Sequence, residues 1–311
     1  MKEPVRHHYI PRFILRAFCD ENGCLSYYDL AKHRVEEKKT EEVFMARNLY
    51  RDTINNPDNP TKIETDLARF EQEVAPLIKR FLSEEGEVKL SVEEDDKLKL
   101  FFAIMSFRSE NVKDMFSDSA TDSFKNFYSF YQEDGNLNDL WKRNLGELVN
   151  CRSLKEVMQN PGIDQPIKLF MRRDTEGLFG MYFIPAEVRG SEDFLISDCY
   201  PAVFQGSSKD EIIKLNMYLV YPISPKKALF LAANGVQSAP LAAAGFRKEF
   251  FRKPSYSPID KTFTFRFRKI YEEDVKMVND TMIENAVEGA AFRDYRRIHN
   301  VKLALGKEPQ S

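Results

Sequence analysis

Residues 217–233 read MYLVYPISPKKALFLAA, and this stretch decides the class of fold. Two apolar runs, 217–224 and 227–233, flank a short turn that contains Pro225. Apolar runs bounded in this way by Pro and Gly are typical of β-strands. Three further segments after Pro161 have the same character: PIKLFMRR (166–173), GLFGMYFI (177–184) and DFLISDCYPAVF (193–204). We therefore expect a mostly antiparallel sheet in the C-terminal half of the chain.

The stretch FTFRFRKI at 263–270 alternates in polarity. Successive side chains of a strand point to opposite faces, so one face holds phenylalanines and the other holds polar residues. The phenylalanines are Phe263, Phe265 and Phe267, and the polar residues are Thr264, Arg266 and Arg268. This pattern predicts a strand with one buried face, and a helix over about 272–304 is expected to close the region.

The first fifty residues are expected to form a small module. Pro11 suits the first turn of a short helix that ends at Cys19, and the turn DENG follows at 20–23. CLSYYDL (24–30) and VEEKKTEEVF (35–44) then read as the two strands of a hairpin.

A helical region follows, over about 61–160. Thr61 with Glu64, and Ser91 with Glu94, have the spacing of capping boxes at helix N-termini. The segment LKLFFAIMSFRSENV at 98–112 is apolar nearly all round, which is typical of a buried helix. The sequence thus predicts an α+β fold: an N-terminal helix–hairpin module, a central helical region, an antiparallel C-terminal sheet and a closing helix. The expected domains are 1–160 and 161–311, or one continuous domain.

The composition is that of an ordinary globular protein, with 42% hydrophobic and 31% charged residues among 311. The net charge of -3 gives no global attraction to nucleic acid, so any polyanion site must be local. No apolar run approaches the roughly 20 residues of a membrane-spanning helix, and no secretory signal is evident. The four cysteines are scattered, as in a cytoplasmic protein with reduced thiols.

The opening stretch HHYIPRFILRAF, His7 to Phe18, concentrates positive charge. On a helix Arg12 and Arg16 share one face and repel each other, so an anionic partner is expected. That partner is either a phosphate of a ligand or a carboxylate of the same chain. His8 or His7 could serve as a metal ligand or general base; the alternative is that one histidine packs internally.

Glu64 and Glu71 lie seven residues apart on the first long helix, where small neighbours suggest partial burial. Buried carboxylates are usually paired or bind metal, so these two are candidate metal ligands, although a helix cap would also account for Glu64. Arg108 lies near the end of an apolar helix, where its charge requires a partner or an anionic ligand.

Two further candidates lie in the C-terminal half. Asp198 follows a strand and precedes Pro201, a place that suits either a site residue or a turn residue. The stretch 247–269 is basic, with interleaved aromatic residues, as in nucleic-acid surfaces, where charge meets phosphates and rings meet bases. The alternative is a solvated strand face with a row of phenylalanines that face the core. The candidate nucleic-acid-binding residues there are Arg252, Lys253, Arg266 and Arg268. Neither GxxxxGK[ST] nor GxGxxG occurs, so nucleotide cradles of those two types are absent.

A pattern like HHYxPxFxLRxF is matched by His7, His8, Tyr9, Pro11, Phe13, Leu15, Arg16 and Phe18. In this the chain resembles the uncharacterised bacterial domain-of-unknown-function 4238 family. The likeness continues at Asn48-Leu49-Tyr50, Ile63-Glu64, Glu71, Arg108, Ser197–Pro201 and Pro222–Pro225. It departs at Leu49, at Ser109-Glu110 and at the inserted Tyr200. The resemblance implies no activity; it implies that these distant residues belong to one pattern, as a composite site would.

These features favour a nucleic-acid-acting protein, in particular a metal-dependent nuclease of the bacterial defence or toxin type. The catalytic candidates are His7, His8 and Asp198; Glu64 and Glu71 would bind Mg²⁺ or Mn²⁺; Arg12, Arg16 and Arg108 would bind phosphate. The alternative is a non-enzymatic sensor or interaction module for a phosphorylated ligand, a nucleic acid or a phage protein. A third reading makes the shared pattern a structural core of buried Arg–Glu pairs.

Overall fold

The computed structural model of the chain describes residues 6–116, 125–126, 137–171, 181–207, 214–233, 246, 248–299 and 301. The chain forms two compact units that interleave along the sequence, whereas the sequence pattern suggests a division near residue 160. The first unit comprises Met1–Tyr9, Met45–Leu77 and Ser91–Leu178, and the second comprises Ile10–Phe44, Ile78–Leu90 and Phe179–Ser311.

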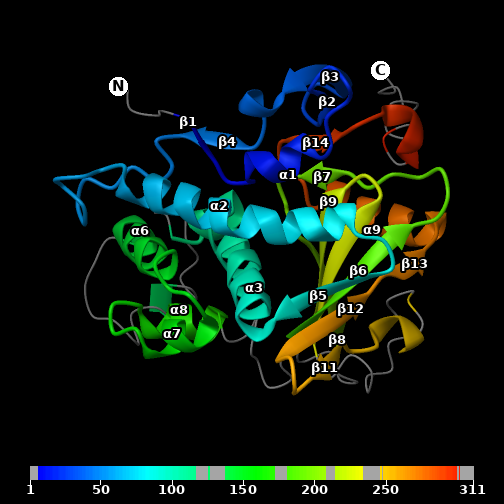
Figure 1. Ribbon diagram of the computed structural model, residues 1–311. Helices are drawn as coiled ribbons and strands as arrows, with labels where there is room; N and C mark the ends of the chain where they lie inside the picture. The colour runs from blue at the N-terminus through cyan, green and yellow to red at the C-terminus, as the bar shows by residue number, and fades with distance from the viewer. Residues whose placement is uncertain are drawn as a thin grey trace. The chain divides into compact units, whose positions relative to one another are not determined.

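The first unit is mainly helical and includes one two-stranded ribbon (Figure 1). In the ribbon β1 (Arg6–His8) pairs antiparallel with β4 (Met45–Arg47). The helices are α2 (Lys62–Ser83, to Leu77 in this unit), α3 (Val92–Phe107), α4 (Glu110–Asp114), α6 (Leu137–Leu148), α7 (Leu154–Gln159) and α8 (Gln165–Met171). The α+β class is confirmed, and the predicted helical region is largely present.

Helix α3 is the buried helix of this unit. Its sequence sets where it begins, through a capping box, and its side chains are mostly apolar and buried. The Ser91 hydroxyl accepts a hydrogen bond from the Glu94 amide at 3.1 Å, and the Glu94 carboxylate accepts one from the Ser91 amide at 2.8 Å. This confirms the predicted capping box. At the other end the Trp141 indole N–H donates to the Phe107 carbonyl at 3.1 Å, which joins α3 to α6.

The segment PIKLFMRR was expected to be a strand, and this prediction is wrong for its described part. Helix α8 begins at Gln165, and the amides of Ile167 and Lys168 both donate to the Asp164 carbonyl at 3.0 Å. Pro166 therefore occupies the first turn of a helix, where a missing amide hydrogen is tolerated. A short apolar run with Pro at its start is compatible with either element.

The second unit contains a five-stranded sheet in the order β13-β6-β10-β9-β8. All its pairs are antiparallel except β13 with β6. The stretch 217–233 forms the β9–β10 hairpin, as predicted. The strands are β6 (Met181–Val188), β8 (Ala202–Ser207), β9 (Lys214–Ser224), β10 (Lys227–Ala233) and β13 (Arg268–Ile270).

A four-stranded sheet in the same unit has the order β3-β2-β14-β7. The hairpin of β2 (Cys24–Asp29) and β3 (Arg34–Lys39) is confirmed, and β7 (Ile196–Ser197) forms the opposite edge. The predicted closing helix is shorter than expected. Helix α9 (Glu272–Glu284) ends before β14 (Gly289–Phe292), which runs between β2 and β7. At Gly289 a Cβ atom would lie 2.3 Å from the Tyr28 carbonyl oxygen, so only glycine fits.

A three-stranded sheet has the order β11-β12-β5 and comprises β11 (Ser255–Ser257), β12 (Thr262–Arg266) and β5 (Glu87–Ser91). Two predictions need correction here. Residues 87–91 form a strand inside the region expected to be helical, and 263–270 is divided between β12 and β13. The division falls at Phe267, whose amide donates to the Gly86 carbonyl at 2.9 Å.

Lys227 closes the C-terminal end of α2 within the second unit. Its ammonium donates to the carbonyls of Phe81, Leu82 and Glu84 at 3.1, 3.0 and 2.8 Å. These are among the carbonyls that a helix end leaves without partners. The ammonium also lies 4.6 Å from the centroid of the Phe267 ring. In the described part of the chain no helix is long and apolar enough to cross a membrane.

Candidate functional site

The first unit brings together residues from four separate stretches of sequence. We call this set the Arg108 cluster; it consists of His7 and His8 on β1, Tyr50 after β4, Glu64 and Glu71 on α2, and Arg108 at the C-cap of α3. All six belong to the pattern that carries the family resemblance. The structure therefore brings these six residues together within this unit.

Arg108 organises the cluster from its centre. Its side chain is 1% exposed. Its Nε donates to the Tyr9 carbonyl at 3.0 Å, and its Nη2 donates to the His8 carbonyl at 3.3 Å. Its Nη1 donates to Glu71 Oε1 at 2.7 Å. Burial alone would lower the pKa of Arg108, but Tyr50 and Glu71 together hold the pKa above its ordinary value.

These contacts define what Arg108 does. All three nitrogens of the guanidinium donate to acceptors of the same chain, so the group fixes strand β1 and Glu71 in place. A buried arginine arranged in this way is a positioning residue. The anionic partner that Arg108 requires is Glu71, a carboxylate of the same chain.

The two histidines of β1 face opposite ways. His7 is fully buried, its Nδ1 accepts a hydrogen bond from the Tyr50 amide at 2.9 Å, and its ring stacks on Tyr50 at 5.6 Å. Because Nδ1 accepts, a proton on the neutral ring is carried by Nε2. His8 is half-buried, and its carbonyl accepts from the Tyr50 hydroxyl at 3.4 Å. His7 therefore packs internally.

Glu64 lies two helical turns before Glu71 on α2 and is half-buried. Among the described residues its carboxylate has no hydrogen-bond or ion-pair partner. The expected capping box is not formed, because the Thr61 hydroxyl donates to Asn59 Oδ1 at 3.3 Å instead. Burial raises the pKa of Glu64 to about 7; the negative charge of Glu71 adds to this rise and Arg108 opposes it. A carboxylic acid with such a pKa can exchange a proton near neutral pH.

The metal hypothesis involves Glu64 and Glu71. In the described ranges no three His, Cys, Asp or Glu side chains gather closely enough to hold a metal ion. Glu71 is engaged by Arg108, which leaves one carboxylate unpaired. Mg²⁺ is often held by one or two carboxylates together with water and substrate oxygens, so binding of Mg²⁺ or Mn²⁺ here stays a hypothesis.

Arg12 and Arg16 belong to the second unit, on α1 (Arg12–Arg16). Arg12 forms an ion pair with Glu41 of the short helix η1 (Thr40–Glu42). The partner of Arg12 is thus a carboxylate of the same chain, although not Glu64 or Glu71. Arg16 is exposed and makes no ion pair with any residue that the structure describes.

Asp198 also belongs to the second unit, and it holds a turn of the backbone. It is 8% exposed, and its Oδ2 accepts hydrogen bonds from the amides of Val287 and Glu288 at 2.9 and 2.8 Å. Its Oδ1 accepts from the Gly289 amide at 3.4 Å. The carboxylate therefore directs the chain from α9 into β14, a turn role at a segment distant in sequence.

Replacing Asp198 by alanine is expected to lower the free energy of unfolding by about 3 kcal/mol, because buried amide groups lose their acceptor. The exposed Asp260 is the matched control, because among the described residues its carboxylate accepts only from the Ser257 hydroxyl of its own turn. Urea unfolding of both alanine variants measures the difference. Equal losses in the two variants would rule out the structural role of Asp198.

The basic stretch of the second unit gathers three arginines. We call Arg252, Arg266 and Arg268 the Arg268 cluster. Burial lowers the pKa of Arg268, and the charges of Arg252 and Arg266 lower it further, so the three lie within electrostatic reach of one another. Arg268 Nε is buried without a hydrogen-bond partner among the described residues. The Glu87 carboxylate lies 3.5 Å from Arg266 Nε, and both of these side chains are exposed.

The aromatic residues of this stretch do not join that surface. Phe246, Phe250 and Phe251 are buried and pack on one another, so the expectation that these rings stack on bases is wrong. Tyr256 is exposed, but it pairs with Phe263, and alternation along β12 puts Phe263 on the opposite face from Arg266. Lys253 lies 5.7 Å from the Tyr182 ring. Arg247 lies outside the described residues.

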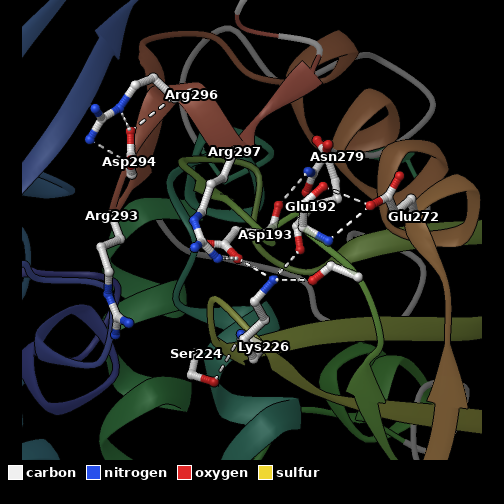
Figure 2. A network of polar contacts seen from close by, with 12 residues as sticks. Glu192, Asp193, Ser224, Lys226, Glu272, Asn279, Arg293, Asp294, Arg296 and Arg297 are labelled. Atoms are coloured by element: carbon white, nitrogen blue, oxygen red, sulfur yellow. Dashed lines mark hydrogen bonds and ion pairs between the residues drawn. The ribbon is translucent and has the colours of Figure 1, made fainter.

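A cavity of about 660 Å³ occurs elsewhere in the second unit. Figure 2 shows the polar network around it, in which the Lys226 ammonium reaches Asp193 at 2.6 Å and Arg296 reaches Asp294 at 2.9 Å. Its charged lining is Asp20, Glu21, Asp193, Asp294, Lys226, Arg293, Arg296 and Arg297. Four carboxylates balance four cations, so the cavity favours neither sign of charge. It also lies in a different unit from Glu64.

The fold and the site together define an α+β protein in which a buried arginine positions Glu71 and a β-strand. A family model described as "Protein of unknown function (DUF4238)" matches residues 6–295. The chain therefore belongs to this family, as the opening motif predicted. No curated protein and no solved structure matches the chain.

Proposed function

We propose that the protein acts on nucleic acid as a phosphodiester hydrolase, in which Glu64 is the acid–base group. The observation that carries this proposal is the carboxylate of Glu64. It is half-buried, has no hydrogen-bond partner in the described part of the chain and has a pKa of about 7. Buried carboxylates with a structural role are normally paired, so an unpaired carboxylate in this setting is suited to acid–base catalysis.

The proposed step is a proton transfer at the Glu64 carboxylate. Ionised Glu64 takes a proton from a water molecule, whose oxygen forms a bond to phosphorus as the bond to the leaving oxygen breaks. The proton then passes to that leaving oxygen, which restores the ionised carboxylate. A divalent ion such as Mg²⁺ or Mn²⁺, where present, would stabilise the charge that develops on the phosphate oxygens.

Arg108 and Glu71 support this step without taking part in the proton transfer. Arg108 holds Glu71 at 2.7 Å and fixes the carbonyls of His8 and Tyr9. The charge of Glu71 helps to keep the Glu64 proton affinity high, while burial supplies the larger share of that effect.

The Arg268 cluster supports nucleic acid as the substrate class. Like charges repel, so three arginines that share one carboxylate partner among the described residues, Glu87, favour a polyanion as a further partner. Since the phenylalanines nearby are buried, contacts here would be to phosphates and would show little preference for base sequence.

A triple variant, Arg252→Gln, Arg266→Gln and Arg268→Gln, is expected to weaken binding of a fluorescein-labelled RNA. The slope of log affinity against log salt should fall by about 2, at about 0.7 for each phosphate contact. Fluorescence anisotropy across a salt series measures both. The control is Lys32→Gln, Arg34→Gln and Lys38→Gln, which removes equal charge at residues that pair with Glu36. A slope that changes equally in both variants would refute the role of the Arg268 cluster.

A non-enzymatic nucleic-acid-binding module is the second candidate. It is favoured by the absence of a three-ligand metal group among the described residues and by the engagement of Arg108 and Glu71 with each other. This candidate predicts salt-dependent binding without cleavage in Mg²⁺ or Mn²⁺. Cleavage that is lost in Glu64→Gln would decide for the hydrolase.

A further inference from the structure

The ribbon of β1 and β4 places two arginines directly opposite each other. In its antiparallel register Arg6 pairs with Arg47, His7 with Ala46 and His8 with Met45. Directly opposed residues of antiparallel strands project from the same face, with their Cβ atoms about 5 Å apart. Arg6 and Arg47 are both exposed.

The charges of these two arginines are not neutralised by the chain. Among the described residues neither Arg6 nor Arg47 makes an ion pair or a side-chain hydrogen bond. Like charges directly opposite each other destabilise a strand pair. An anion between the two guanidinium groups would convert this repulsion into attraction, and the planar guanidinium fork matches the oxygens of a phosphate.

The ribbon is also part of the frame of the Arg108 cluster. Alternation along β1 turns His7 inward, where it is fully buried, and leaves Arg6 and His8 on the outer face. The His8 carbonyl accepts from Arg108 Nη2 at 3.3 Å, and the His7 ring accepts from the Tyr50 amide at 2.9 Å. One strand thus holds the arginine pair on one face and contacts the residues that position Glu71 on the other.

We propose that Arg6 and Arg47 form a clamp for a backbone phosphate of single-stranded nucleic acid. This inference rests on the proposed function, because it names the group by which a nucleic-acid substrate is held in the first unit. The clamp recognises the charge of the phosphate and does not distinguish between bases, because the two guanidinium groups contact phosphate oxygens.

The test is the double variant Arg6→Gln, Arg47→Gln, measured with fluorescein-labelled single-stranded RNA in EDTA, so that binding is separated from cleavage. Loss of two phosphate contacts is expected to lower the salt slope by about 1.4, at about 0.7 for each contact. The affinity at moderate salt should fall on the order of tenfold. Anisotropy over a salt series gives both quantities.

The matched control is Arg152→Gln, Lys155→Gln, which removes equal charge from exposed residues of the same unit near α7. A slope that falls in the ribbon variant and not in the control supports the clamp. An unchanged slope, a fall equal to that of the control, or no binding by the parent overturns it. Inorganic phosphate that binds the parent, without any change of RNA affinity in the ribbon variant, also overturns the backbone assignment.

These outcomes are distinct from those that test the proposed function. If the parent binds RNA but never cleaves it, the proposed hydrolase activity is rejected. The salt slope of the ribbon variant then tests the clamp independently. If Glu64→Gln abolishes cleavage while the ribbon variant binds RNA like the parent, the proposed hydrolase activity is supported and the proposed phosphate clamp is rejected. Thermal unfolding of the ribbon variant is expected to match or exceed the parent, because removal of the opposed charges relieves repulsion.

Discussion

Replacing Arg108 by methionine is expected to lower the free energy of unfolding by about 3 kcal/mol. Removal of one partner from a buried ion pair leaves an uncompensated charge and unsatisfied acceptors. Here these are Glu71 and the carbonyls of His8 and Tyr9. The expected loss is at the lower end for such pairs because the Glu71 side chain is 23% exposed and keeps part of its hydration. Urea unfolding followed by circular dichroism measures it.

Two companion variants identify the contact that matters. Arg108→Lys keeps the charge but cannot reach three acceptors with a planar fork, so it should lose most of the same stability. Glu71→Gln keeps an acceptor for Arg108 and should lose only about 1 kcal/mol. If Arg108→Met unfolds at the same urea concentration as the parent, the cluster does not hold this unit together.

Glu64→Gln is expected to separate activity from stability. Removal of an acid–base group should reduce cleavage on the order of a hundredfold or more. The same change should make the protein more stable than the parent above neutral pH, because glutamine carries no charge into the half-buried site. A side chain that lowers the stability of its own folded protein is typical of a functional position.

The sign of the pH effect follows from the pKa of Glu64, which burial raises from 4.5 to about 7. Below 4.5 the carboxyl is protonated in both the folded and unfolded states and contributes nothing to their difference. Between 4.5 and about 7 the unfolded state ionises while the folded state keeps its proton, so stability falls across this window and stays at the lower level above it. The limit is about 3 kcal/mol, and residual solvation of a half-buried group makes the observed value smaller.

Unfolding of the parent and of Glu64→Gln at about pH 5 and about pH 8 measures this difference. The control is Glu73→Gln, on the exposed side of α2, whose carboxylate pairs with Lys97 at 2.7 Å. Its stability should follow the parent at both pH values. If the parent and Glu64→Gln respond equally to pH, Glu64 does not titrate as described, and its acid–base role fails with it.

Local patterns predicted much of the fold. The hairpin at 217–233, the hairpin of β2 and β3, and the capping box that begins α3 each depend on residues close in sequence. The errors have two origins. Helix α8 replaces an expected strand because Asp164, which directly precedes it in sequence, accepts its first amides. Residues 87–91 form a strand because β12, which is distant in sequence, lies beside them.

The candidate site was predictable by residue but not by role. The sequence indicated His7, Glu64, Glu71 and Arg108 as parts of one pattern, and the first unit does contain them all. It could not show that Arg108 donates to the backbone of β1, because that contact joins residues about a hundred positions apart. The opposition of Arg6 and Arg47 is likewise a matter of strand register, which sequence alone leaves open.

Strand β14 has a consequence for how the chain is made. It completes the sheet between β2 and β7, yet it is synthesised long after the hairpin that it joins. Until then one edge of β2 is open to other strands, and open edges promote association between chains. Synthesis on the ribosome thus exposes the N-terminal hairpin for most of translation, a period in which the open edge of β2 can pair with strands of other chains.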